Sequence, residues 1–212
     1  MKIKKLGHCC LIIETNGRKI MTDPGFYTVE EQIKEKNIDL ILITHEHGDH
    51  LHIESLKKVL ANNPDAKIVT NNGVGKLLNE AGIKYQVLND KVAEKILGIE
   101  IEAHDCKHEE IYKDYLQVQN TAFFIDKRFF YPGDSFYNPK KPVEILALPV
   151  AGPWANIRSA TKYALKIKPK FCFPVHDGML KNFGGFYKVP ELFLSKVGII
   201  FKNFEENKEE EF

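Results

Sequence analysis

The chain has 212 residues, of which 43% are hydrophobic and 28% are charged, and its formal net charge is +1. This length supports one substantial core, and the composition argues against disorder and coiled coil. The charge lacks the basic excess of a nucleic-acid-binding protein, and no apolar run approaches the ~18 residues of a membrane span, so we expect neither nucleic acid nor membrane insertion. Four cysteines, with Cys9 and Cys10 adjacent, fit reduced thiols in a cytoplasmic protein, and the oligomeric state stays open.

The first half of the chain alternates short strands with helices. The dipeptide Asn16-Gly17 favours a hairpin between strands at 10–14 and 18–22, because Asn-Gly tolerates positive φ. The apolar run Leu40-Ile41-Leu42-Ile43 predicts a strand at 39–44 that is buried on both faces. The remaining expected elements are helices at 29–36, 54–62 and 74–81 and a strand at 67–70.

Strands dominate the second half. They are expected at 85–88, 92–96, 99–103, 121–125, 128–131, 145–148 and 170–174, with helices at 157–166 and 191–196. Strands and helices alternate in each half, which favours mixed sheets covered by helices in an α/β (α+β) fold. We expect a single domain over residues 1–204, followed at 205–212 by an acidic tail whose composition fits a solvated, disordered end.

One loop concentrates metal-binding side chains. Thr44-His45-Glu46-His47-Gly48-Asp49-His50 directly follows the most apolar strand, so it lies at the carboxyl end of a sheet, where ligands bind in α/β proteins. In a loop, His45 and His47 can aim at one ion while Asp49 and His50 aim at a neighbouring one. Imidazole and carboxylate are ligands that zinc, iron and manganese accept, so the loop predicts a metal site.

The H-x-H-x-D-H pattern at residues 45–50 resembles the signature of the metallo-β-lactamase-like superfamily, and further motifs of that superfamily follow in order. Thr22-Asp23-Pro24-Gly25 resembles the motif whose Asp supports the metal loop. Pro132-Gly133-Asp134-Ser135 resembles the motif whose carboxylate bridges two ions, and Pro174-Val175-His176-Asp177 resembles that of the last metal histidine. The resemblance covers about residues 1–180. It implies a four-layer αββα sandwich with two mixed sheets packed face to face and helices outside.

The remaining ligand position has two candidates, His104 and His108. A His-x-x-x-His spacing recurs in relatives, where the second His is the ligand, so His108 is favoured and His104 is the alternative. The resemblance thus implies seven metal ligands: His45, His47, Asp49, His50, His108, Asp134 and His176. Asp23 would support them. Trp154, the only tryptophan, is a candidate wall of the substrate pocket, with core packing as the alternative.

The resemblance implies a dinuclear metal-dependent hydrolase. Two divalent ions, zinc first and manganese or iron as alternatives, would share a water that ionises near neutral pH. The bridging hydroxide would attack a carbonyl or phosphorus, with Asp134 bridging the ions and Asp49 orienting the nucleophile or accepting its proton. The expected substrate is an ester, lactone or phosphodiester in a small, anionic molecule.

The metal loop and the compact ending after His176 look most similar to the ascorbate-6-phosphate lactonase-like and N-acylphosphatidylethanolamine-phospholipase-like branches. One alternative is a mononuclear-iron dioxygenase similar to persulfide dioxygenases, although Asp49, His50 and His176 argue for a second metal. Another alternative is a catalytically silent binding protein on the same fold, which the full ligand set disfavours. His8 and His52 lack motif support and are expected in an early turn and at a helix start.

Overall fold

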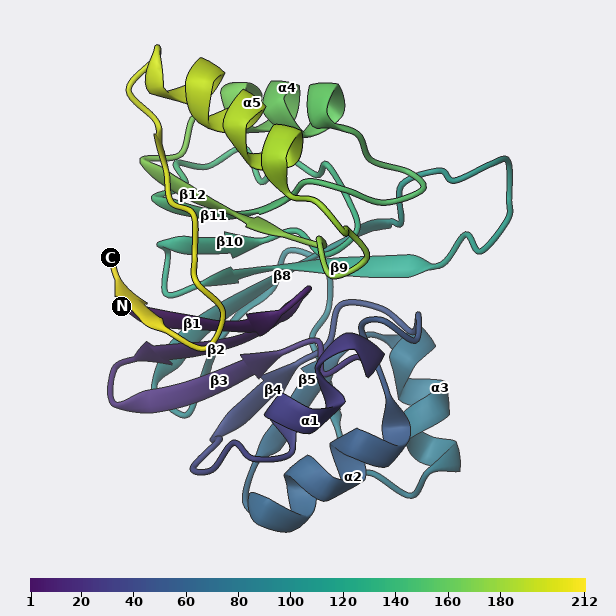
Figure 1. Cartoon of the computed structure of the whole chain (residues 1–212). Helices are drawn as coiled ribbons and strands as arrows, with labels where there is room; N and C mark the ends of the chain where they lie inside the picture. The colour runs from purple at the N-terminus through teal and green to yellow at the C-terminus, as the bar shows by residue number, and fades with distance from the viewer.

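The computed structural model describes residues 1–212, and its strands form two seven-stranded mixed sheets packed face to face (Figure 1). The first sheet has the order β14-β1-β2-β3-β4-β5-β6 and the second β13-β12-β11-β10-β9-β8-β7. The strands of the first sheet are β1 (Lys2–Gly7), β2 (Cys10–Thr15), β3 (Arg18–Thr22), β4 (Leu40–Leu42), β5 (Lys67–Thr70), β6 (Gln86–Val87) and β14 (Glu209–Glu211). Those of the second are β7 (Ala93–Ile96), β8 (Ile99–Lys107), β9 (Gln119–Ile125), β10 (Phe129–Tyr131), β11 (Ile145–Pro149), β12 (Phe171–Val175) and β13 (Ile200–Phe201).

Helices cover the outer face of each sheet (Figure 1). On the first sheet lie the 3₁₀ turn η1 (Phe26–Thr28), α1 (Val29–Gln32), α2 (Ile53–Asn62) and α3 (Asn72–Glu80), and on the second lie α4 (Ile157–Ile167) and α5 (Gly184–Ser195). The expected four-layer αββα sandwich is therefore confirmed. No helix is both long and apolar enough to cross a bilayer.

Strand β4 is buried on both of its faces. Leu40 and Leu42 pack in the core between the sheets, whereas Ile41 and Ile43 pack under the helices of the first sheet. Alternation of side chains along a strand sends successive residues to opposite faces, so a run of four apolar residues suits a strand buried on both. This prediction from the sequence is confirmed, and it places the loop that follows Ile43 at the end of a rigid strand.

Two expectations at the C-terminus differ from the structure. The acidic tail is not a disordered end, because β14 pairs with β1 and sets Glu211 opposite Lys2 and Glu209 opposite Lys4. Charged composition suggested solvation, but without β14 the strand β1 would be the edge of its sheet, and its backbone groups pair with the tail. The last helix begins at Gly184, ahead of the expected start at 191, and contains Pro190. Packing of α5 against α4 outweighs the poor local helix propensity.

Candidate metal centre

Loops from both sheets meet at one edge of the sandwich. The segment Thr44–His50 follows β4, His108 follows β8, Asp134 follows β10, and His176 follows β12. Because β8 and β10 each pair antiparallel with β9, and β11 and β12 run parallel to β10, these strands share a direction and their carboxyl ends meet. The topology thus gathers side chains that lie up to 131 residues apart in the sequence (176 − 45).

The first group of donor atoms comes from His45, His47 and His108, whose ligand atoms all lie within 4.8 Å of one another. The rings of His47 and His108 are 4.6 Å apart and those of His45 and His108 are 5.1 Å apart. His47 Nε2 lies 3.1 Å from the carbonyl oxygen of Leu116, which it reaches as a donor. In that tautomer His47 Nδ1 keeps its lone pair.

The second group consists of Asp49, His50, Asp134 and His176, again within 4.8 Å of one another. Asp134 Oδ2 lies 2.8 Å from His176 Nε2, and Asp134 Oδ1 lies 3.0 Å from His50 Nε2. Asp134 Oδ2 is also 3.2 Å from His108 Nε2 in the first group. Asp134 therefore lies between the two groups, where a single carboxylate can reach both.

Several histidines are oriented by an acceptor behind the ring. The Nδ1 partners are Asp23 Oδ2 for His50 at 2.7 Å, the carbonyl of Glu109 for His108 at 2.6 Å, and the carbonyl of Ala151 for His176 at 2.7 Å. Donation from Nδ1 turns Nε2 toward the centre, which is the ring orientation that a metal-binding histidine adopts.

Four buried atoms at this centre make no hydrogen bond of good geometry: His45 Nε2, His50 Nε2, His176 Nε2 and Asp134 Oδ1. For His50 and His176 the closest carboxylate oxygens are those of Asp134. An unpartnered buried polar atom costs free energy, so a cluster of them calls for a ligand that satisfies all at once. Imidazole lone pairs and carboxylate oxygens are what a divalent transition metal accepts. The residues present therefore fit a bound cation.

Asp23 hydrogen-bonds both ends of the segment Thr44–His50. It is fully buried and accepts from the Thr44 backbone N–H at 2.8 Å, from the Thr44 hydroxyl at 2.7 Å and from Tyr131 Oη at 2.6 Å. Together with its contact to His50, these bonds fix both ends of the H-x-H-x-D-H segment. Burial, followed by the nearby Asp23 carboxylate, raises the pKa of Tyr131, so its hydroxyl keeps the proton that it donates.

The charges at the centre are strongly coupled. Burial alone would raise the pKa of Asp134, but the neighbouring His176 and His50 hold it well below its usual range. Burial alone would lower the pKa of His50 and of His176, but the Asp134 carboxylate raises both. At His45 burial prevails and the pKa is lowered. The centre thus keeps an ionised carboxylate surrounded by imidazoles, which is the electrostatic arrangement that a cation would take over.

His104 lies outside both groups, whereas His108 lies within the first. β8 extends to Lys107, beyond the expected end at 103, so His104 is still inside the strand and shares a face with Glu102. Its ring packs near Tyr137, with centroids 5.3 Å apart, and Glu102 Oε1 is 3.4 Å away. The position of the strand end is what separates the two histidines.

His8 is a residue that the sequence reasoning missed. It is buried in the turn between β1 and β2, and its Nδ1 accepts from the Gly178 N–H at 3.1 Å. Nε2 therefore carries the proton, and it lies 3.3 Å from Asp49 Oδ2. Burial lowers the pKa of His8 to about 4, so the ring is neutral. The sequence offered one signal for His8: it directly follows a strand that ends at the site.

Trp154 lies in the cleft above the donor atoms. Its Nε1 donates to Asp134 Oδ2 at 3.0 Å, and its ring is 5.3 Å from that of His176 and 5.7 Å from that of His108. The cleft has a volume of about 600 Å³, which is in the range of small-molecule sites. Trp154 is thus both a wall of this cleft and a donor to the central carboxylate.

Residues 2–176 match the family model of a β-lactamase superfamily domain. A UPF0173 protein of Pyrococcus abyssi is 32% identical over 194 residues, which cover 87% of this chain and 86% of that relative. The UPF0173 metal-dependent hydrolase of Carboxydothermus hydrogenoformans is 28% identical over 196 residues, covering 83% and 84%. The structure of the metallo hydrolase Igni18 from Ignicoccus hospitalis has the same fold, with a TM-score of 0.78 and 21% identity over 100% of this chain and 98% of that one. The family expected from the motifs is confirmed: the chain belongs to the metallo-β-lactamase superfamily of metal-dependent hydrolases.

Proposed function

We propose that the chain is a dinuclear hydrolase. His45, His47 and His108 would hold one divalent ion, and Asp49, His50 and His176 a second, with Asp134 between them. Zinc suits this set of imidazoles and carboxylates, and manganese or iron are the alternatives. Bound there, the ions would supply a water that ionises near neutral pH and would polarise the oxygen of the bond to be cleaved.

The chain's own residues would then position the nucleophilic water and accept its proton. Asp49 is the carboxylate best placed to orient a nucleophilic water or to accept its proton, because it is the partly exposed carboxylate of the second group. His8 holds Asp49 from behind, and Trp154 Nε1 holds Asp134. The proposed reaction needs no serine or cysteine nucleophile. Hydrolysis of an ester, lactone or phosphodiester in a small molecule is the reaction that this arrangement supports.

The observation that carries the proposal is the set of buried, unpartnered nitrogen and oxygen atoms that converge on two points. Hydrogen bonds from Nδ1 hold several of the rings with Nε2 turned toward the centre, so a dinuclear site would be preorganised. A single ion in the second group would leave His45 Nε2 without a partner, and a single ion in the first group would leave the other three atoms without one.

The test is elemental analysis of protein purified without a metal-binding tag, followed by a panel of acyl esters, lactones and phosphodiesters. We expect about two equivalents of zinc or manganese per chain and turnover of one substrate class. His108→Ala should lose metal and turnover, while the matched variant His104→Ala should keep both. A single iron with oxygen uptake would replace the proposal by dioxygenase chemistry. No metal after reconstitution, or no turnover across the panel, would contradict it.

A further inference from the structure

The cleft above the donor atoms contains no lysine or arginine. Its only charged side chains other than histidine are the carboxylates of Glu46, Asp49 and Asp134. An anionic group remote from the reacting bond is normally held by lysine, arginine or backbone N–H groups. The walls of this cleft therefore offer no side-chain cation to a distant phosphate or carboxylate, which argues against the small anionic substrate expected from the sequence.

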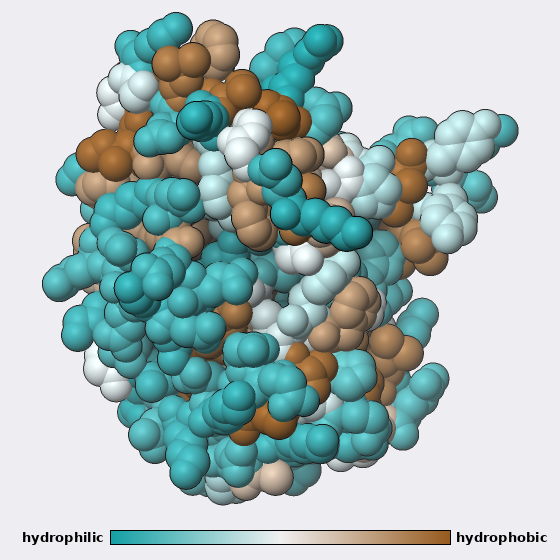
Figure 2. All heavy atoms as spheres, viewed as in Figure 1, coloured by the Kyte–Doolittle hydropathy of each residue, from teal (hydrophilic) through white to brown (hydrophobic).

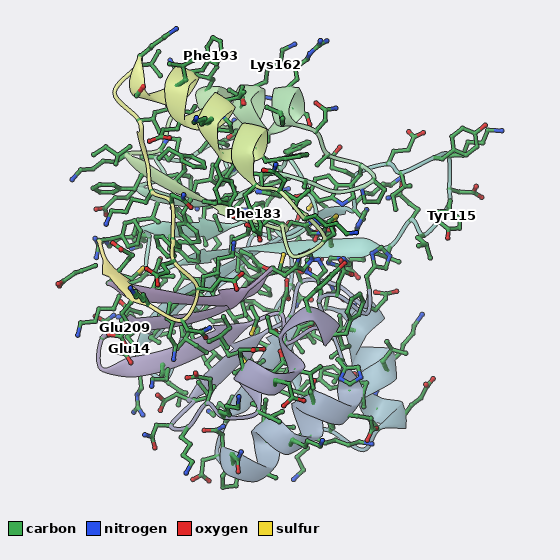
Figure 3. The ribbon with its side chains drawn as sticks, viewed as in Figure 1. Glu14, Tyr115, Lys162, Phe183, Phe193 and Glu209 are labelled. Carbon is green, nitrogen blue, oxygen red and sulfur yellow. The ribbon has the colours of Figure 1, made fainter.

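The part of the lining away from the carboxylates and histidines is apolar. It consists of Ile111, Leu116, Val118, Pro153, Trp154 and Met179. Leu116 belongs to the arm at 109–118 that projects from the body of the molecule, with Tyr115 at its outer end (Figures 2 and 3). Leu116 is 51% exposed and Tyr115 62% exposed, while the Leu116 carbonyl accepts from His47. Apolar side chains exposed beside a catalytic centre are typical of a site that covers an apolar ligand.

A second cavity of about 580 Å³ adjoins this cleft. Its lining is Ala151, Gly152, Ala155, Asn156, Ile157, Arg158, Met179, Leu180 and Phe186, so Met179 lines both spaces. Its wall is tied to the metal centre, because the Ala151 carbonyl accepts from His176 Nδ1. The unbranched thioether of Met179 can change rotamer between the two spaces, as methionine does at adaptable apolar surfaces.

We propose that this second cavity is a subsite for an apolar arm of the substrate. The inference rests on the proposed hydrolase: the ester or lactone group lies at the donor atoms, and an alkyl or aryl arm passes Met179 into the cavity between the start of α4 and the start of α5. Met179 lines both spaces, and the cleft has no lysine or arginine in its walls; both observations support this occupant. The single cation that lines the cavity, Arg158, is exposed to solvent.

Binding can be tested without turnover, because Trp154 is the only tryptophan and lies in the cleft. Titration with neutral alkyl amides of increasing length should change its fluorescence saturably, and Kd should fall about threefold to fourfold per added methylene. Phe186→Asp should remove this dependence on chain length, since Phe186 lines the second cavity. Leu192→Asp on the same helix is the control, because Leu192 is 55% exposed and lines neither space. No dependence on length, or an equal loss in the control, would overturn the inference.

Turnover separates this inference from the proposed function. With metal-loaded protein, kcat/KM for p-nitrophenyl esters should rise on the order of a hundredfold from acetate to hexanoate, at about threefold to fourfold per added methylene, and Phe186→Asp should flatten that series. Equal rates along the series would overturn the subsite and leave the hydrolase standing. Binding of amides without cleavage of any ester would overturn the hydrolase and leave the apolar subsite standing. A preference for esters with a terminal carboxylate, lost in Arg158→Ala, would show an anion site instead and overturn the subsite.

Discussion

Replacing His8 by Phe tests whether this histidine positions Asp49. Phenylalanine keeps a ring of similar shape against His176 and Tyr27, whose centroids lie 4.3 and 4.4 Å from that of His8. It removes the Nε2–H donor to Asp49 and leaves the Gly178 N–H without an acceptor. A hydrogen bond to a charged group contributes about 1.5–3 kcal/mol, and the 3.3 Å length puts this one at the lower end. We therefore expect about a tenfold loss of affinity at the proposed second metal position.

The assay is a zinc titration in competition with a chelator, which resolves the two equivalents by affinity. His8→Phe should weaken the equivalent that uses Asp49, and leave the equivalent on His45, His47 and His108 unchanged. His104→Phe is the matched control: it is the same substitution at another buried histidine, whose two ring nitrogens have no hydrogen-bond partner. Wild-type affinity for both equivalents in His8→Phe, or a similar loss in His104→Phe, would refute the positioning role.

Three further predictions concern single features. Asp134→Asn should lower the affinity for both proposed metal equivalents, because Asp134 reaches both groups. Elemental analysis after dialysis should show both equivalents depleted. Loss of only one would contradict the bridging position. Lys5→Met should lower the free energy of unfolding by about 3–5 kcal/mol in urea titration, since it leaves the buried Asp177 carboxylate, 2.5 Å from Lys5 Nζ, without its cation. An unchanged midpoint would show that this pair contributes nothing. Ellman's reagent should modify Cys106 first in the folded protein and all four thiols in denaturant. The reason is that the other three thiols are buried, and burial raises the pKa of Cys172 to about 12. Rapid reaction of several thiols in the folded state would contradict this and show an open core.

The sequence alone determined the features that depend on neighbours along the chain. The apolar run 40–43 marked a strand buried on both faces, and the hairpin at Asn16-Gly17 forms as predicted, with φ of 49° and 71° at its two turn residues. The H-x-H-x-D-H segment placed its side chains within one loop. Spacing of a few residues limits the geometry of such a loop so strongly that residue types and order are enough to predict donors close in space.

Only the tertiary structure decided the contacts between distant segments. His104 and His108 are four residues apart, and they were separated by where β8 ends. His8 meets Asp49 and Gly178 because the turn after β1 lies beside the loops that follow β4 and β12. The tail at 205–212 ends in a strand because it pairs with β1. The cleft lacks lysine and arginine because the loops that surround it place none in its lining. These partners are up to 209 positions apart (211 − 2), and no local propensity encodes a pairing that is set by sheet order and packing of the whole chain.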